Sequence, residues 1–171
     1  TIAYVPEDRY HTGCVGTMSI AENFALTQLT SYSAGVAGAR LNRKKMVRDG
    51  AKAIDDFNIK AESCTDSVRS LSGGNLQKVI LSRELSRKPK LFIAEQPTQG
   101  LDIASTEDIW QALLECRKEA AVLLVTGDLR EVLSLSDRIG VIFNGRLLDI
   151  IDAKDPDQIG RVGLLMAGVE S

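Results

Sequence analysis

The residues best suited to chemistry in this sequence are Ser72, Gly73 and Gly74, which stand immediately before a run with helical apolar spacing. A serine hydroxyl can cap the first turn of such a helix, and glycines without Cβ atoms let a ligand approach the backbone N–H groups. A helix N-terminus also carries about +0.5 charge and unpaired donors. The segment is therefore predicted to hold a phosphate group, although an isolated Ser-Gly-Gly would more simply be a flexible joint and a cap.

A second candidate segment follows the helix and begins with the apolar run from Leu91 to Ala94, which ends at Glu95. The chain then continues through Gln96 to Asp102 and into another helical pattern. Ligands bind at the carboxyl ends of strands in parallel sheets, so polar side chains after this strand are expected to face a ligand. The presence of this second segment favours the phosphate interpretation of residues 72–74 over the flexible joint.

The elements that must position these residues alternate between short apolar runs and helical patterns. Runs at residues 2–5, 91–94, 122–125 and 139–143 are predicted to be buried strands, because turn-forming residues bound each of them. The alternation predicts an α/β fold with a largely parallel sheet flanked by helices. Asn144-Gly145 lies between two apolar runs and predicts a late β-hairpin, because both turn positions need positive φ.

Residues 19–70 look like a helical insert distinct from the sheet. Ser19 and Glu22 have the spacing of a capping box, which predicts the start of a helix. Residues 31–39 are expected to form a loose connector, and a further helix is predicted from Asn42. Its apolar or small stripe is Met46, Val47, Ala51, Ile54 and Phe57.

Basic side chains lie between the members of that stripe, at Arg43, Lys44, Lys45, Arg48 and Lys52. A solvated helical face explains them at least as well as contact with a membrane subunit does. A last helix is predicted around residues 157–166, interrupted by Gly160 and Gly163. The sequence is thus divided into residues 1–18, the helical insert 19–70, and residues 71–171.

Composition limits the function classes. The chain has 171 residues, of which 44% are hydrophobic and 26% charged, which are ordinary values for one globular domain. The net charge of −2 supplies no field that would attract nucleic acid. No apolar run is long enough to span a membrane and no export leader is expected. The three cysteines lack metal or disulfide spacing, and Cys116 is expected to be a small buried hydrophobe.

Together these segments resemble the nucleotide-binding domain of ATP-binding-cassette (ABC) transporters. Residues 71–74, Leu-Ser-Gly-Gly, are similar to the signature motif, residues 91–95 to the Walker B strand, and residues 100–102 to the D-loop. Residues 1–23 resemble the Q-loop and the start of the helical subdomain, and residues 126–129 resemble the switch-histidine segment. The resemblance implies a P-loop NTPase-like core with an inserted helical subdomain, and ATP and Mg²⁺ as cofactors.

The sequence departs from this family at its own nucleotide site. Nothing in it matches G-x-x-x-x-G-K-[ST], a loop that in the family precedes the Q-loop and is expected upstream of Thr1. Glu7 occupies the Q-loop glutamine position, where its charge would repel a phosphate unless Mg²⁺ or Arg9 screens it. Gln96 and Gly127 occupy the catalytic glutamate and switch histidine positions. Loss of a positioned base typically lowers a rate by about 10²–10⁴-fold.

In the family, each ATP lies between the Walker motifs of one cassette and the signature motif of another. The resemblance therefore implies that Ser72, Gly73, Gly74, Asn75 and Asp102 serve the partner's nucleotide, while Glu7 and Glu95 belong to this chain's own site. Glu95 is the candidate for holding Mg²⁺ through a water molecule. No catalytic residue is expected in the own site, so the chain alone is expected to be inactive as an ATPase.

Pro6-Glu7-Asp8-Arg9, the asparagine at position 75 and residues 94–102 are similar to the C-terminal cassette of fused two-cassette ATPases for simple-sugar and nucleoside import. The expected partners are a second nucleotide-binding domain, membrane permease subunits and, indirectly, a periplasmic or lipoprotein solute-binding protein, with no nucleic acid. The expected location is the cytoplasmic face of the cell membrane. Two alternatives remain: a soluble ABC ATPase acting on nucleic acid or ribosomes, and an inert interaction module.

Overall fold

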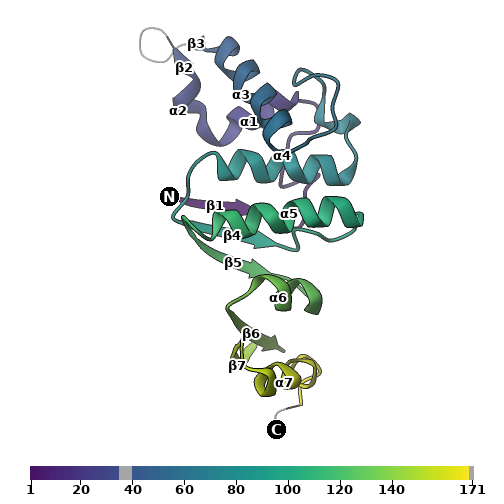
Figure 1. Ribbon diagram of the computed structural model, residues 1–171. Helices are drawn as coiled ribbons and strands as arrows, with labels where there is room; N and C mark the ends of the chain where they lie inside the picture. The colour runs from purple at the N-terminus through teal and green to yellow at the C-terminus, as the bar shows by residue number, and fades with distance from the viewer. Residues whose placement is uncertain (35–39, 170–171) are drawn as a thin grey trace. The chain divides into compact units, whose positions relative to one another are not determined.

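The computed structural model describes residues 1–34 and 40–169, and within them the chain forms two compact units. The first unit runs from Thr1 to Val125 and the second begins at Thr126. The predicted division at residues 18 and 70 stays a prediction. Figure 1 shows the order of the elements along the chain.

A parallel sheet forms the base of the first unit. It contains β1 (Ile2–Val5), β4 (Leu91–Glu95) and β5 (Ala121–Val125) in the order β1-β4-β5. Ile2 pairs with Leu91, which pairs in turn with Ala121, and all neighbours run parallel. The positions of these three predicted strands and the α/β class are therefore confirmed, whereas the predicted burial is wrong for one face of β1 and β5, which is exposed.

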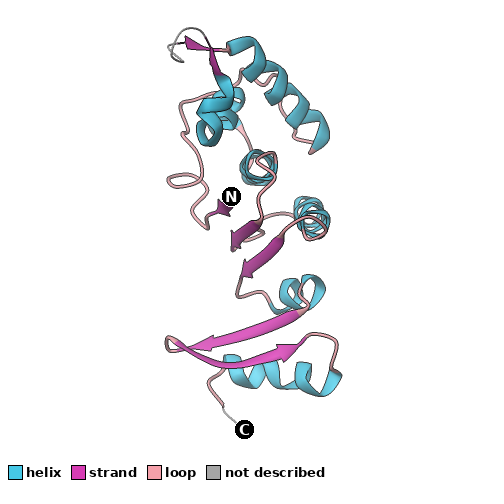
Figure 2. Ribbon diagram, turned by 90° about the vertical axis from the view of Figure 1, so that its left-hand side faces the viewer, coloured by secondary structure: helices cyan, strands magenta, loops and turns pink. Residues whose placement is uncertain are grey.

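Two helices cover one face of this sheet, α4 (Gly73–Leu85) and α5 (Ile103–Cys116), as the edge-on view in Figure 2 shows. Side chains alternate between faces along a strand, so every second residue points toward these helices. Those residues form the core of the sheet and are fully buried at Ala3, Val5, Phe92 and Ala94. The opposite face is exposed and apolar at Ile2, Tyr4, Leu123 and Val125.

Helix α4 is buried around most of its circumference rather than along one stripe. Leu76, Val79 and Ile80 are buried as predicted, whereas Leu85 is only half-buried. The remaining sides are enclosed because the sheet and the helical part of the unit both contact this helix. Polar side chains therefore also become buried along it, at Gln77, Lys78, Ser82, Arg83 and Glu84.

The helical part begins at α1 (Ile20–Ala25), where Ser19 and Glu22 form the predicted capping box. The Glu22 N–H donates to Ser19 Oγ over 3.2 Å, and the Ser19 N–H donates to Glu22 Oε2 over 2.9 Å. Asn23 is fully buried and binds the loop before the helix, since its amide donates to the carbonyls of Val15, Met18 and Ser19. This buried amide fixes where the helix starts.

The connector predicted for residues 31–39 is wrong at its beginning. After the short 3₁₀ turn Leu26–Gln28, residues 31 and 32 complete α2 (Leu29–Tyr32). Two further residues form β2 (Ser33–Ala34), which pairs antiparallel with β3 (Arg40–Leu41). Burial of Tyr32 against α3 explains why the chain is ordered here. Residues 35–39 of the predicted connector lie outside the described residues.

Helix α3 (Arg43–Asp56) begins at Asn42 as predicted, with the Asn42 side chain accepting from the Lys45 N–H over 3.0 Å. Its buried stripe is Met46, Gly50 and Ala53, while Val47 and Ala51 of the predicted stripe are exposed. The buried stripe therefore lies on a different side of the helix from the predicted stripe, because Gly50 lies directly against Ala21 of α1. A Cβ at Gly50 would lie 3.0 Å from Ala21 Cα.

The basic residues of α3 engage local partners. Lys45 lies 4.0 Å from the centre of the Tyr32 ring and forms an ion pair with Asp49 over 3.0 Å. Arg48 also contacts Asp49, over 3.2 Å. Burial raises the pKa of Tyr32 to about 12, and the nearby Asp49 carboxylate adds to the shift. These contacts account for part of the charge run within the fold.

The second unit contains α6 (Leu129–Leu135), the hairpin of β6 (Arg138–Phe143) and β7 (Arg146–Asp152), and α7 (Pro156–Met166). The predicted hairpin is confirmed, because Asn144 and Gly145 connect the strands with φ of 47° and 76°. The predicted last helix is confirmed as α7. The unit has its own core, which consists of Ile139, Val141, Ile151, Val162 and Leu165.

Two sequence expectations concern the chain as a whole. Within the described ranges, none of the helices has the length and apolar character needed to cross a membrane. All three cysteines are free thiols, and Cys14 and Cys64 are buried. Cys116 is half-buried rather than fully buried, because it lies in the last turn of α5 beside a cavity.

The contact between α3 and α1 gives a test of the fold. Replacing Gly50 by Val should destabilise the protein by about 1–3 kcal/mol, because the Cβ alone would lie 3.0–3.3 Å from Ala21 and Cys64 and the methyl groups need further space. The matched variant Ala51→Val adds the same side chain one residue later, at an exposed position. It should change stability by less than about 0.7 kcal/mol. Denaturation midpoints in guanidinium measure both, and equal losses would contradict the packing.

Candidate functional site

The start of α4 presents Ser72 at the surface. The Ser72 hydroxyl oxygen accepts from the Asn75 N–H over 3.4 Å and from the Asn75 side-chain amide over 2.9 Å. Asn75 is itself held because its Oδ1 accepts from the Lys60 N–H over 2.8 Å. Both contacts to Ser72 use lone pairs of the oxygen, so the hydroxyl can still donate its hydrogen to a ligand.

Gly74 brings the start of α4 against the start of α5. A Cβ at Gly74 would lie 2.3 Å from Ser105 Oγ and 3.7 Å from Asp102 Oδ2. Rotation of the hydroxyl would not make room for a side chain, because the Cβ would also lie 2.8 Å from Ser105 Cβ, which moves only with α5. Gly74 and Asp102, predicted from separate motifs, are thereby brought to neighbouring positions. We call Ser72, Gly73, Gly74, Asn75 and Asp102 the signature tip.

Within the signature tip, Asp102 caps α5. Its two carboxylate oxygens accept from the Ser105 N–H over 2.8 Å and from the Ser105 hydroxyl over 2.9 Å. These hydrogen bonds hold the pKa of Asp102 below its usual value, the backbone bond contributing most. Because both oxygens are engaged by Ser105, the side chain orients the segment before α5.

Arg9 forms two hydrogen bonds that the sequence did not predict. The sequence offers it as a screen beside Glu7, but its guanidinium lies between the signature tip and the segment before α5. Nη1 donates to the carbonyl of Gly73 over 3.5 Å, and Nη2 donates to the carbonyl of Gln99. The side chain is buried, and this burial lowers the pKa of Arg9. The sequence shows an arginine directly after Pro6-Glu7-Asp8, but it does not indicate which groups the guanidinium binds.

The predicted own site lies at the carboxyl ends of β1 and β4. The Tyr4 hydroxyl on β1 donates to Glu95 Oε2 at the end of β4. This bond is the largest cause of the raised pKa of Tyr4, and the charges of Glu95 and Glu7 raise it further. Glu7 and Glu95 are therefore both close enough to Tyr4 to raise its pKa. The sequence did not predict that Tyr4 lies beside these two carboxylates.

Glu95, the candidate magnesium ligand, has one carboxylate oxygen engaged by Tyr4. Mg²⁺ is usually held by one or two carboxylates together with phosphate oxygens and waters. Across residues 1–34 and 40–169, no group of three or more His, Cys, Asp or Glu side chains could hold a metal ion. The assignment of Mg²⁺ to Glu95 stays a prediction.

Gln96 and Gly127 follow the ends of two neighbouring strands. Gln96 adopts φ of 45°, and its N–H donates to the Val125 carbonyl over 2.8 Å, which binds it to the end of β5. Its amide group cannot take up a proton as a carboxylate would. Gly127 lies in the exposed link between β5 and α6 of the second unit and has no side chain to donate a hydrogen bond.

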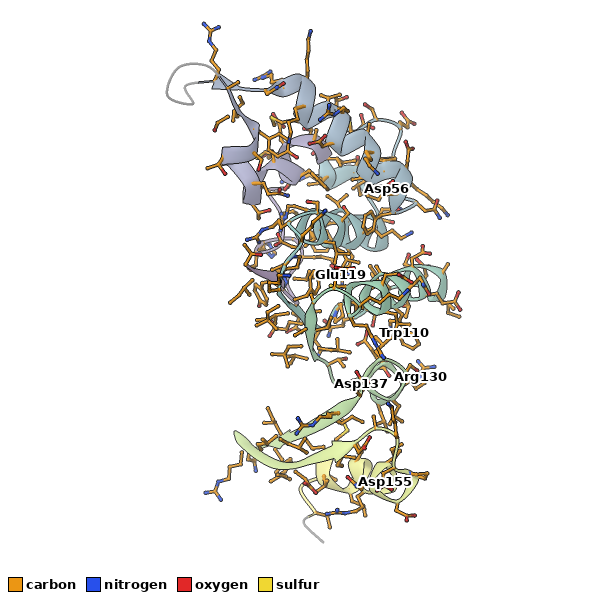
Figure 3. All side chains as sticks on the ribbon, turned by 60° about the vertical axis from the view of Figure 1, so that its left-hand side comes forward. Asp56, Trp110, Glu119, Arg130, Asp137 and Asp155 are labelled. Atoms are coloured by element: carbon orange, nitrogen blue, oxygen red, sulfur yellow. The ribbon has the colours of Figure 1, made fainter. Side chains whose placement is uncertain are left out.

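A cavity of about 710 Å³ lies elsewhere in the first unit, beside the later turns of α4 and α5. Asp56 and Glu119, labelled in Figure 3, are among its lining residues. Lys78 also lines it, with Nζ 2.5 Å from Asp108 Oδ2 and 3.1 Å from the Asn58 carbonyl oxygen. None of the predicted site residues lines this cavity, so it is separate from the signature tip.

Comparison with known proteins places this geometry in context. No protein-family model matches the chain. It is 37% identical over 168 residues to the guanosine import ATP-binding protein NupO of Bacillus subtilis, covering 98% of this chain and 32% of that protein. It is also 37% identical over 169 residues to the nucleoside import ATP-binding protein NupA of Lactococcus lactis, with coverage of 98% and 33%. The chain thus spans about a third of the length of these relatives.

Among solved structures, the fold resembles the ATP-binding cassette MJ0796 in a dimeric, post-hydrolysis state bound to ADP and Pi. The TM-score is 0.72 with 21% identity, over 91% of this chain and 64% of that one. This likeness confirms the fold. The chain belongs to the ABC family and is an ATP-binding domain related to the ATPases of sugar and nucleoside importers.

Proposed function

We propose that this chain is part of the ATP-binding subunit of an importer for simple sugars or nucleosides, and that its signature tip completes the ATP site of a second cassette. The observation that carries the proposal is the exposed Ser72 hydroxyl, held by Asn75 at the start of a helix whose Gly74 packs on α5. The relatives that import guanosine, nucleosides and ribose support the substrate class.

The tip has the chemistry needed to meet a terminal phosphate. A helix N-terminus supplies backbone donors and partial positive charge, and Ser72 adds a hydroxyl donor at the same point. Donors that are held before the reaction stabilise developing charge without reorganisation. Because Asn75 fixes the hydroxyl oxygen and Gly74 fixes the helix, the tip is already organised in the free chain.

This chain's own site is proposed to be silent. Gln96 stands where a base is needed, and Gly127 stands where a histidine donor is needed. The hydrogen bond from Tyr4 to Glu95 supports the same conclusion, because it engages the carboxylate that would face magnesium. ATP and Mg²⁺ would therefore be held by the Walker motifs of the second cassette.

The proposed partners follow from the importer assignment. They are a second nucleotide-binding domain, either fused or paired, membrane permease subunits, and indirectly a periplasmic or lipoprotein solute-binding protein. The assembly would lie on the cytoplasmic face of the membrane, with ATPase activity in the whole assembly. The relatives favour this function over a soluble ATPase that acts on nucleic acid or ribosomes.

Replacing Ser72 by Arg in the full-length protein should lower steady-state ATPase activity by at least about 10²-fold, because it removes one donor and places a bulky side chain against the phosphate. Ser72 is exposed, but its hydroxyl caps α4, so the change also costs about 0.5–2 kcal/mol of stability and the melting temperature is measured alongside. Ser70→Arg, at an exposed position two residues earlier, is the matched control and should retain activity. Equal activity of the Ser72 variant and the control would overturn the proposal.

Gln96 tests the silent site. Gln96→Asn keeps a residue type that tolerates the left-handed φ of 45°, and Gln96→Ala removes the amide altogether. Both should leave steady-state ATPase turnover of the full-length protein within about twofold, because hydrolysis takes place at the other composite site. A large loss of turnover in both variants, with unchanged protein levels and melting temperature, would show that the own site is active.

A further inference from the structure

A buried arginine links three segments that are far apart in the sequence. Arg9 is 8% exposed, and its guanidinium donates to the carbonyls of Gly73 at the start of α4 and Gln99 before α5. Its hydrogen-bond partners are backbone carbonyls rather than carboxylates, so the charge gains no ion pair from these contacts. A buried charge held in this way is unusual enough to require a reason in function or positioning.

The segment that carries Arg9 is a tight, internally bonded turn. Asp8 Oδ1 accepts from the N–H groups of Tyr10 and His11 over 3.1 and 3.0 Å. The Asp8 carbonyl accepts from the N–H groups of Thr12 and Gly13 over 3.1 and 2.9 Å. Because the turn is bonded within itself, the base of the Arg9 side chain starts from a fixed position.

The same turn is attached to α4 at a second point. Arg83, in the last part of α4, donates from Nη1 to the Gly13 carbonyl over 2.9 Å. The turn therefore contacts both the first and the last part of this helix. Arg9 differs from Arg83 because only Arg9 also bonds the segment before α5, at Gln99.

The geometry favours arginine over any other cation. A planar guanidinium presents donors in a fixed fork that can reach two carbonyls at once, whereas a lysine ammonium is a single point on a flexible stem. The fork lies directly beside Gly73, because a Cβ at Gly73 would lie 3.4 Å from both Arg9 Nη1 and the Tyr10 hydroxyl, at van der Waals contact. The fork thus sets the distance between the Gly73 and Gln99 carbonyls.

From these contacts we propose that Arg9 is a positioning residue, which holds the signature tip and the segment before α5 as one rigid surface for the partner's nucleotide. The proposal rests on the function proposed above. Arg9 acts through Ser72 and its neighbours and does not itself touch the nucleotide. Its loss should therefore slow the step in which the tip meets the phosphate, with little effect on nucleotide binding by the other cassette.

The test compares Arg9→Lys and Arg9→Met with Arg69→Lys, an exposed arginine near the tip, all in the full-length protein. Both Arg9 variants should lower kcat for ATP by about ten- to hundredfold with KM changed less than about twofold, since small misplacements of a site are costly. Lysine should not rescue the activity, because the fork rather than the charge is needed. Arg69→Lys should leave both constants unchanged.

Amide hydrogen exchange separates positioning from a general structural role. In Arg9→Lys, exchange should rise at residues 73–76 and 99–102, while the last turns of α4, which Arg83 still holds, keep their protection. Exchange that rises along the whole helix, or full activity of Arg9→Lys, would overturn the proposal. If Ser72→Arg abolishes turnover while the Arg9 variants keep it, this inference fails and the proposed function stands.

Discussion

The structure of the candidate site depends on one close contact, the approach of α4 to α5 at Gly74. There is no space for a side chain here, because Ser105 Oγ would lie 2.3 Å from a Cβ. The contact brings Gly74 of the signature tip against Asp102 and Ser105 at the start of α5, so that two motifs distant in the sequence meet, with Ser72 exposed beside Gly73.

The two ends of the site differ in how their polar groups are used. At the signature tip, hydrogen bonds from Asn75 leave the Ser72 hydroxyl able to donate outward. At the strand ends, Glu95 accepts an internal hydrogen bond from Tyr4, and Gln96 is tied through its backbone to β5. The Ser72 hydroxyl can thus donate to a ligand, whereas the Glu95 carboxylate is already bonded within the chain. This difference is what we expect of a domain that contacts the nucleotide of a second cassette rather than a nucleotide of its own.

Local signals predicted much of this fold. The run Ile2–Val5, the capping box at Ser19 and the turn at Asn144-Gly145 each depend on neighbouring residues, and each is confirmed. Features set by distant segments were missed. The stripe of α3 is rotated because Gly50 packs on Ala21, a contact that apolar spacing cannot predict. The contacts of Arg9 were missed for the same reason, since Gly73 and Gln99 approach it only in the folded chain.

The most direct test of the central claim is to map where the terminal phosphate of ATP lies in the full-length assembly. An ATP analogue with a photoreactive group on its γ-phosphate can be bound, illuminated, and located by peptide mass spectrometry. The account predicts crosslinks from the second cassette's nucleotide to the peptide that contains Ser72–Asn75. Crosslinks confined to the strand ends around Glu7 and Glu95, with none at the start of α4, would contradict it.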